Sequence, residues 1–190
     1  MKAVLNRVIA LVAALVVAAS VAAAAPADQM SERAAFEQLA KKVRKELVTL
    51  PWYGVFDNLE YAIDGSTVTL SGQVVQPSTR KDAERRVRKL AGVERVVNNI
   101  EVLPLSSFDD RIRVSAYRSL FGWNSPLFRY GLGANPSIHI VVDRGHLTLE
   151  GVVSTEGDRR LAYMLANSVP GVFSVTNNLR TDRDERAPAR

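Results

Sequence analysis

Apolar and polar side chains alternate in two stretches of this chain that are far apart in sequence but carry the same pattern. The apolar members are Leu59, Tyr61 and Ile63 in the first stretch, and Ile138, Ile140 and Val142 in the second. A period of two predicts a strand with one buried face. Asp64-Gly65 then supplies a tight turn, and a return strand follows in each stretch with a glycine inside it, Gly72 or Gly151. A glycine at such a place predicts a bulge or a close approach of two backbones.

Helical spacing precedes and follows each predicted hairpin. After the hairpins, the apolar positions are Ala83, Val87 and Leu90, and in the second stretch Ala162, Ala166 and Val169. Before them, the apolar faces consist of Phe36, Leu39, Ala40, Val43, Leu47 and Leu50, and of Phe108, Ile112, Ala116 and Leu120. Ser78 or Thr79 is the expected N-cap of the helix that follows the first hairpin, and Ser106 or Ser107 that of the helix before the second. Gly92 and Gly171 are expected just past the helix ends.

The two stretches are copies of one unit. Residues 59–101 align without a gap on residues 138–180, and twelve of the aligned pairs are identical. The identities fall at turns and alternate core positions, which favours duplication over chance. The pair Asn98-Asn99 recurs as Asn177-Asn178 within the last predicted strand, and its recurrence favours a structural role such as bonding the backbone.

The element order predicts an α+β fold. Each copy reads α-β-β-α-β and forms a small three-stranded mixed sheet with two helices on one face. The expected domains are residues 33–103 and residues 107–181, joined by a short connection, and the charged tail at residues 182–190 is expected to be disordered.

Residues 1–27 have the features of a secretory signal peptide. Lys2 and Arg7 precede an uncharged apolar run at residues 8–21, and small residues that suit cleavage after Ala24 or Ala27 follow. An uncleaved anchor is the alternative. The chain has no cysteine, which excludes disulfides and a lipidated N-terminal cysteine. Without the signal, 23 basic residues face 20 acidic ones, an excess too small to indicate nucleic acid binding.

These motifs resemble the BON-domain family of periplasmic and outer-membrane proteins of bacteria. The first copy carries IDGSTVTLSG at residues 63–72, Ala83, and GVERVVNN at residues 92–99. The second copy has the same marks, although Asp143-Arg144-Gly145 departs from the Asp-Gly order and leaves its turn type open. The resemblance implies a non-catalytic envelope protein without a cofactor, located in the periplasm. Related proteins bind phospholipid surfaces or envelope partners, often in osmotic or envelope stress.

The first helix of the second copy is apolar on two sides, which makes it the candidate binding surface. Val114, Tyr117 and Phe121 lie opposite its core face, and Arg111 and Arg118 flank them. Trp123, Phe128 and Arg129 follow directly. Arginines beside aromatic side chains suit an anionic phospholipid surface, because aromatic rings favour the membrane interface and arginine pairs with phosphate. The sequence does not fix the oligomeric state.

Other interpretations stay open for this surface. Val114, Tyr117 and Phe121 could pack against the first domain, or residues 122–137 could fold over them. A protein–protein adaptor or stress chaperone of the envelope could use the same surface without binding lipid. The basic run at residues 80–89 is interrupted by Asp82 and Glu84, which favours a solvated helix face. Trp52 and Tyr53 are expected to plug the core rather than contact a ligand.

No set of residues indicates catalysis. The sequence has no glycine-rich phosphate loop after a strand and no Gly-x-Ser-x-Gly elbow. His139 and His146 flank one hairpin, but their spacing and the nearby carboxylates do not match known metal sites. We therefore expect a binding protein with no catalytic residue and no metal ligand.

Overall fold

A computed structural model describes residues 26–133 and 135–182 of the chain. The predicted signal peptide, apart from its last two residues, and the predicted disordered tail, apart from Asp182, lie outside these residues. The chain divides into two compact units, residues 1–35 and residues 36–190, and both predicted sheets lie in the second unit. Within the described residues, no helix combines the length and the apolar character needed to span a membrane.

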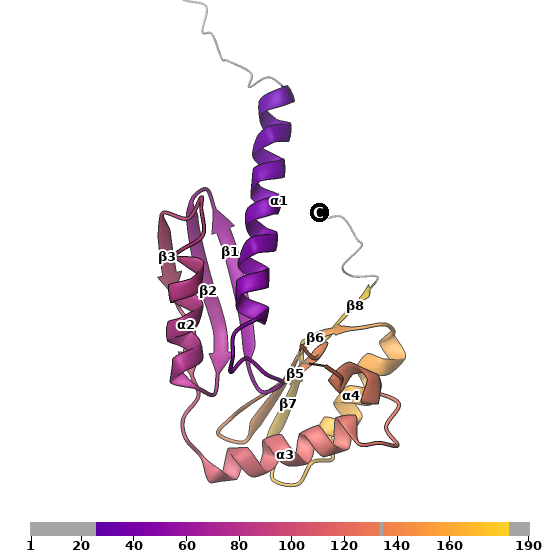
Figure 1. Cartoon of the computed structure of the whole chain (residues 1–190). Coiled ribbons are helices and arrows are strands. Elements are labelled where there is room, and N and C mark those ends of the chain that lie inside the picture. The colour runs from indigo at the N-terminus through magenta and orange to yellow at the C-terminus, as the bar shows by residue number, and fades with distance from the viewer. Residues whose placement is uncertain (1–25, 134, 183–190) are drawn as a thin grey trace, which may run out of the picture. The chain divides into compact units, whose positions relative to one another are not determined.

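The described elements occur twice in the same order (Figure 1). The first repeat contains α1 (Pro26–Val48), β1 (Asn58–Asp64), β2 (Thr67–Val74), α2 (Pro77–Val87), β3 (Arg95–Asn98) and β4 (Glu101–Val102). The second repeat contains α3 (Ser107–Phe121), the short helix η1 (Phe128–Gly131), β5 (Ile138–Asp143), β6 (His146–Val153), α4 (Glu156–Asn167), β7 (Ser174–Asn177) and β8 (Arg180–Thr181). The predicted α+β fold with two α-β-β-α-β units is therefore confirmed.

Each sheet is mixed, as predicted. β2 lies between an antiparallel β1 and a parallel β3, and β6 lies in the same way between β5 and β7. In the first repeat, apolar side chains of α1, such as Val43, and of α2, such as Val87, are buried in one cluster with Leu70 of β2. Both helices thus cover the same face of the sheet.

The prediction of one continuous third strand is wrong, because this strand is interrupted at the asparagine pair. The backbone N–H of Ile100 donates to Asn98 Oδ1 (3.2 Å), and Asn98 Nδ2 donates to the carbonyl of Arg80 (3.1 Å). Asn177 makes the same two bonds, to the N–H of Leu179 and the carbonyl of Arg159. These bonds separate β3 from β4 and β7 from β8. The predicted structural role of the pair is confirmed.

Gly72 and Gly151 allow the close backbone approach that the sequence predicted. Their φ angles are +104° and +119°. A Cβ atom on either residue would lie only 2.1 Å from a carbonyl oxygen of the neighbouring chain segment, that of Asn58 or of Ser137. Only glycine leaves room for that carbonyl, and it also tolerates the positive φ.

The two hairpin turns differ in type. Gly65 is the residue with positive φ in the first turn (+56°), whereas Arg144 (+49°) and Gly145 (+80°) both have positive φ in the second. Two positive values are the signature of a type I′ turn. Arg144 is the one non-glycine residue with positive φ in the described part of the chain.

Two predicted helix caps have different outcomes. Ser106 is the N-cap of α3, and its side chain accepts the N–H of Asp109, as expected. Ser78 and Thr79 do not cap α2, because this helix begins earlier, at Pro77, with Gln76 as its N-cap. The same helix ends at Val87, so Gly92 lies several residues beyond its end, although its φ is positive (+95°).

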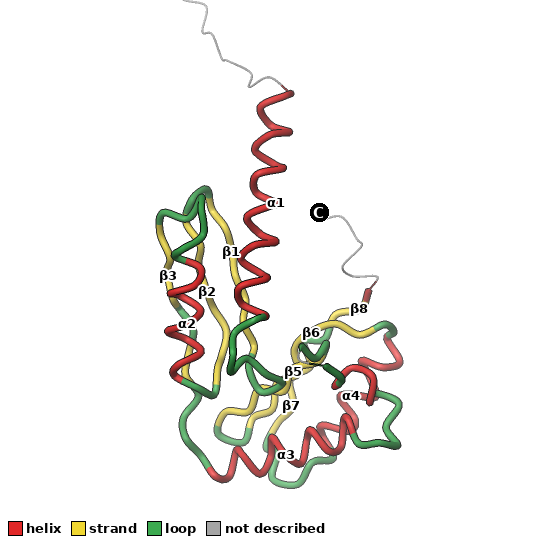
Figure 2. Tube along the Cα trace, in the orientation of Figure 1, coloured by secondary structure: helices red, strands yellow, loops and turns green. Residues whose placement is uncertain are grey.

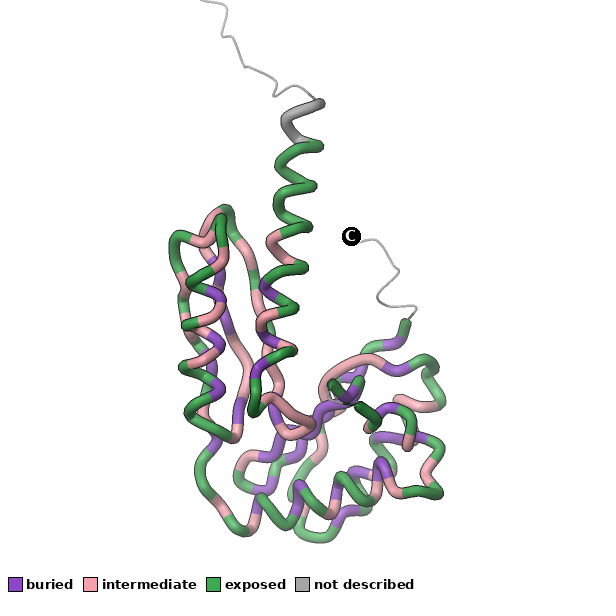
Figure 3. The backbone as a smooth tube through the Cα atoms, viewed as in Figure 1, coloured by how far each residue is buried: buried purple, intermediate pink, exposed green. Residues whose placement is uncertain are grey.

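The two repeats have separate cores (Figure 3). The second core is the larger, and it extends to Val55 and Phe56 from the loop between α1 and β1. Figure 2 draws this loop as the connection between α1 and β1. Phe36 was expected in the first core, but half of its surface is exposed.

Candidate functional site

α3 is fixed to the β5–β6 hairpin by two buried charged residues. Asp109 accepts the backbone N–H groups of Arg144 (3.1 Å) and Gly145 (2.8 Å). Arg113 donates to the carbonyl of Val142 (2.6 Å) and to Asp110 (2.6 Å). Such bonds between ionised groups and backbone are stronger than neutral ones. They determine which side of α3 faces the core and which side faces solvent.

The solvent side of α3 carries most of the predicted binding residues. Arg111 and Arg118 are exposed, and Val114 and Tyr117 are 43% and 39% exposed. Directly after the helix, 85% of the Trp123 side chain is exposed. The structure therefore brings five of the predicted residues to one exposed side of the second repeat.

The prediction that Phe121 belongs to this surface is wrong. Only 4% of Phe121 is exposed, and it lies in the core cluster of the second repeat. A Cβ atom at Gly131 would lie 2.5 Å from the Phe121 ring, so the backbone of η1 passes directly over that ring. The alternative that residues 122–137 fold over this stripe thus holds for Phe121.

Tyr117 supports the other alternative in part, since it packs against the first repeat. Its ring makes edge contacts with Phe56 (6.3 Å between centroids) and Phe121 (5.3 Å). Tyr117 thus joins the two repeats while keeping part of its surface in solvent.

Trp123 and Phe128 form an edge-to-face pair with 5.2 Å between ring centroids. The Ser125 hydroxyl donates to the carbonyl of Leu120 (2.6 Å), which fixes the loop that carries Trp123. The exposed indole is therefore held by its contact with Phe128 and by a loop that is hydrogen-bonded to the end of α3.

Arg129 is also exposed, but its guanidinium is held within the second repeat. It donates to the Tyr130 hydroxyl (2.8 Å) and to Asp158 (3.0 Å), and its carbon lies 4.7 Å from the centre of the Tyr130 ring. These contacts assign Arg129 to the packing of η1 against the start of α4.

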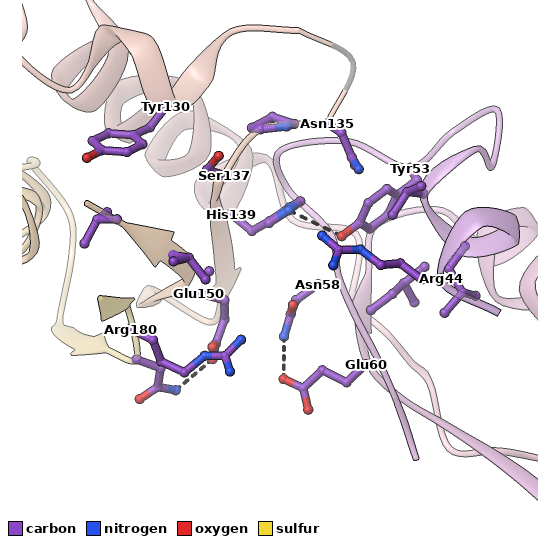
Figure 4. A pocket seen from close by; sticks show the side chains of 18 of the residues that line it. Arg44, Tyr53, Asn58, Glu60, Tyr130, Asn135, Ser137, His139, Glu150 and Arg180 are labelled. Atoms are coloured by element: carbon purple, nitrogen blue, oxygen red, sulfur yellow. Dashed lines mark hydrogen bonds between the residues drawn. The ribbon is translucent and has the colours of Figure 1, made fainter. Parts of the chain in front are cut away.

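A cleft of about 920 Å³, which no sequence pattern predicted, lies between the two repeats, and Figure 4 shows residues that line it. It is lined from the first repeat by Arg44, Tyr53, Asn58 and Glu60, and from the second by Ser137, His139, Glu150 and Arg180, among others. Burial, with a smaller contribution from Glu60, raises the pKa of Glu150 above its ordinary value. The cleft depends on how the repeats pack, which no local sequence pattern encodes.

His139 joins the repeats at the edge of this cleft. Its Nδ1 lies 3.2 Å from the carbonyl oxygen of Gly54, and its Nε2 lies 3.3 Å from the Tyr53 hydroxyl. A carbonyl can only accept, so Nδ1 carries the proton and Nε2 accepts from Tyr53. Nearby, the N–H of Ile140 donates to the carbonyl of Val55 (2.7 Å).

This environment favours the neutral form of the histidine. Burial lowers the pKa of His139 and raises the pKa of Tyr53 to about 12. The expectation that Tyr53 plugs the core holds in part, since Tyr53 packs against the first core but also lines the cleft. It fails for Trp52, which is 64% exposed.

The basic run of α2 forms a solvated, internally paired face, as predicted. Arg85 pairs with Asp82 (2.7 Å), and Arg88 pairs with Glu84. Among the described residues, no group of three or more histidine, cysteine, aspartate or glutamate side chains could hold a metal ion.

Comparisons with known proteins place these features in context. The C-terminal domain of CdsD, described as the structural protein of the type III secretion system of Chlamydia trachomatis, is 10% identical with a TM-score of 0.31. That match covers 75% of this chain and 96% of that domain. Another structure of CdsD is 11% identical with a TM-score of 0.28, covering 80% of this chain and all of the other. At these scores neither likeness carries an argument about this chain.

No curated protein sequence matches the chain. The model of the BON domain matches residues 36–104 and again residues 110–183, which together make up most of the chain. These matches coincide with the two α-β-β-α-β repeats, and the chain therefore belongs to the BON-domain family and carries two copies of its domain.

Proposed function

We propose that this chain is a non-catalytic binding protein of the bacterial envelope that attaches to anionic phospholipid surfaces. The contact is the exposed side of α3 with the loop after it, formed by Arg111, Val114, Tyr117, Arg118 and Trp123. We call these five residues the α3 surface. The observation that carries the proposal is the 85% exposure of Trp123, whose ring packs against Phe128 in the loop directly after α3, a helix that also exposes Arg118.

The composition of the α3 surface suits a headgroup layer better than open water. A tryptophan favours the membrane interface, where its ring is partly buried and its N–H stays hydrated. Each arginine near an anionic membrane contributes roughly 1 kcal/mol. Two arginines and one tryptophan support a weak, reversible and salt-sensitive attachment.

Vesicle flotation tests the proposal. The purified chain is mixed with phosphatidylcholine vesicles that contain roughly one third phosphatidylglycerol, or none, since only the anionic vesicles should attract it. The chain is expected to float with the anionic vesicles only. The double variant Trp123→Ala, Arg118→Glu is expected to stay at the bottom of the gradient.

A matched control separates this effect from a general change of charge. The variant Trp52→Ala, Lys89→Glu also removes an exposed tryptophan and reverses an exposed positive charge, but both residues lie in the first repeat. It is expected to float like the original chain. Equal loss of flotation in both double variants, or no flotation of the original chain, contradicts the proposal. If the original chain instead captures one envelope protein stoichiometrically through Trp123 and Arg118, the adaptor function replaces lipid attachment.

The proposed location is the periplasm, reached through the signal peptide predicted at residues 1–27 and without lipidation. The proposed role is envelope maintenance or tolerance of osmotic stress. Mass spectrometry of the protein from a periplasmic extract is expected to find an N-terminus just after Ala24 or Ala27. A deletion strain is expected to recover more slowly from hyperosmotic shock. Detection of the unprocessed chain alone, in the cytoplasmic fraction, contradicts this location.

A further inference from the structure

A second group of aromatic and basic side chains, exposed except for the partly buried Phe108, lies at the far end of α3 from Trp123. We call it the aromatic tip, and it consists of Phe108, Arg111, Arg144, His146 and Phe173. Phe173 is 70% exposed, and the centre of its ring lies 5.7 Å from that of Phe108 and 6.1 Å from that of His146. The guanidinium carbon of Arg111 lies 5.9 Å from the centre of the Phe108 ring. These side chains join the turn before β6, the loop before β7 and the start of α3.

Phe173 is held in its exposed position by the backbone. Its N–H donates to the carbonyl of Gly145 (2.8 Å), and a Cβ atom at Gly145 would lie 2.6 Å from its ring. Next to it, His146 Nδ1 lies 2.7 Å from the Ser174 hydroxyl oxygen. The ring thus rests directly on the turn between β5 and β6, in a position ready to contact a partner.

The first repeat shows that the fold does not need an aromatic residue at this position. Glu94 occupies the place of Phe173, and its N–H donates to the carbonyl of Ser66 (2.9 Å), the counterpart of Gly145. The Glu94 side chain accepts a hydrogen bond from the Ser66 hydroxyl (2.9 Å). The same backbone therefore carries a hydrated carboxylate in one repeat and an exposed phenylalanine in the other. The shared backbone geometry therefore does not by itself require a phenylalanine at this position.

The charges around the aromatic tip favour an anionic partner. Both oxygens of the buried Asp109 accept backbone N–H groups, from Arg144 and Gly145, which ties this carboxylate to the turn. Asp143 lies 3.7 Å from the Arg144 guanidinium. Arg111 and Arg144 are both exposed, and Arg111 lies over the Phe108 ring.

We propose that the aromatic tip is a second contact with the anionic phospholipid headgroup layer, so that α3 lies parallel to the membrane. This inference rests on the function proposed for the α3 surface. The spacing of three and four residues along α3 places one row of side chains on a line from the tip towards Trp123, namely Phe108, Arg111, Ser115 and Arg118. α3 has 15 residues and is therefore about 22 Å long, which separates two aromatic anchors with arginines between them.

Fluorescence quenching by brominated lipid tests the contact at the tip directly. To keep Trp123 in place, the probe is a fluorophore attached to one introduced cysteine, since the chain has none of its own. The cysteine is introduced by Phe173→Cys, or by Glu94→Cys as the matched control in the first repeat. Anionic vesicles with brominated acyl chains are expected to quench the fluorophore at position 173 and leave the one at position 94 unquenched. In the original chain, Phe173→Glu is expected to weaken vesicle binding roughly tenfold, and Glu94→Phe is expected not to weaken it.

The outcomes separate this inference from the proposed function. If the labelled chains bind vesicles but the fluorophore at position 173 is quenched no more than that at position 94, the tip contact is wrong and the α3 surface stands. If the original chain binds no vesicles, both proposals are wrong. If Phe173→Glu changes a dimer into a monomer in sedimentation without any quenching at position 173, the tip joins two copies of the chain, and the lipid contact is overturned. Circular dichroism melts verify that each variant is folded.

Discussion

Gly72 allows a close approach of β1 and β2, and the consequence of filling its space can be worked out against a control in the same repeat. Gly72 and Gly92 have similar φ angles, +104° and +95°. A Cβ atom at Gly92 would meet no atom within 4 Å, whereas one at Gly72 would lie 2.1 Å from the carbonyl oxygen of Asn58. Alanine therefore strains the backbone at both positions but collides with a neighbour only at Gly72.

Backbone strain and the collision with Asn58 lower the free energy of unfolding by amounts that differ enough to be measured. A positive φ costs a non-glycine residue roughly 1–2 kcal/mol, which is the whole expected effect of Gly92→Ala. Gly72→Ala must in addition move β1 by about 1 Å, which disturbs the pairing of Asn58 with Gln73 and of Leu59 with Gly72. With each backbone bond contributing roughly 0.5–1.5 kcal/mol net, we expect Gly72→Ala to lower the free energy of unfolding by about 3–5 kcal/mol.

Urea unfolding, followed by circular dichroism, measures the difference. At roughly 1–3 kcal/mol per molar urea for a small domain, Gly72→Ala is expected to unfold about 1–2 M below Gly92→Ala. Trp52 lies in the first repeat, so its fluorescence in a Trp123→Phe background reports that repeat separately. Coincident midpoints for the two alanine variants would show that β1 moves aside freely, and the argument that this close approach requires glycine would be refuted.

Three further predictions concern the second repeat. Burial lowers the pKa of His139, so the histidine binds more protons when residues 53–57 are detached from it than when they pack on it. The packing of residues 53–57 is therefore expected to be complete above pH about 6.5 and to weaken as the pH falls below that value. Hydrogen exchange of these residues measures the effect, and a pH-independent protection would count against it. Asp109→Asn leaves one buried N–H facing an amide donor and is expected to cost about 1–3 kcal/mol of stability in thermal melts; an unchanged melting temperature would contradict this. Phe121→Ala is expected to lower the free energy of unfolding by about 3–5 kcal/mol, whereas Trp123→Ala is expected to change it by no more than about 0.5 kcal/mol, as measured by urea unfolding. Equal losses would contradict the different burial of the two rings.

Much of the fold could be predicted from local patterns, because the forces behind them act over a few residues. The alternation of Leu59, Tyr61 and Ile63, the turn at Gly65 and the glycine at position 72 each specify backbone geometry without reference to distant residues. The interruption at Asn98 could not be predicted, since its amide bonds the carbonyl of Arg80, which only folding brings near.

Positions in the candidate site that depend on distant segments of the chain could not be predicted either. A helical wheel places Phe121 opposite the core face of α3, and within the helix this placement is sound. The wheel does not include η1, whose backbone at Gly131 passes over the Phe121 ring. The cleft beside His139 was missed for a related reason, because it exists only where the Tyr53 loop packs on β5.

The duplication also supplies a criterion that a single copy cannot. Where both repeats keep the same residue with the same bond, as at Asn98 and Asn177, the backbone itself explains the choice. Where the backbone bond is the same but the side chains differ in kind, as at Glu94 and Phe173, the shared backbone does not determine the side chain. A 70% exposed phenylalanine loses favourable burial that a carboxylate at the same place does not need. The difference between the repeats is therefore the physical reason for proposing a membrane contact at that end of the second repeat.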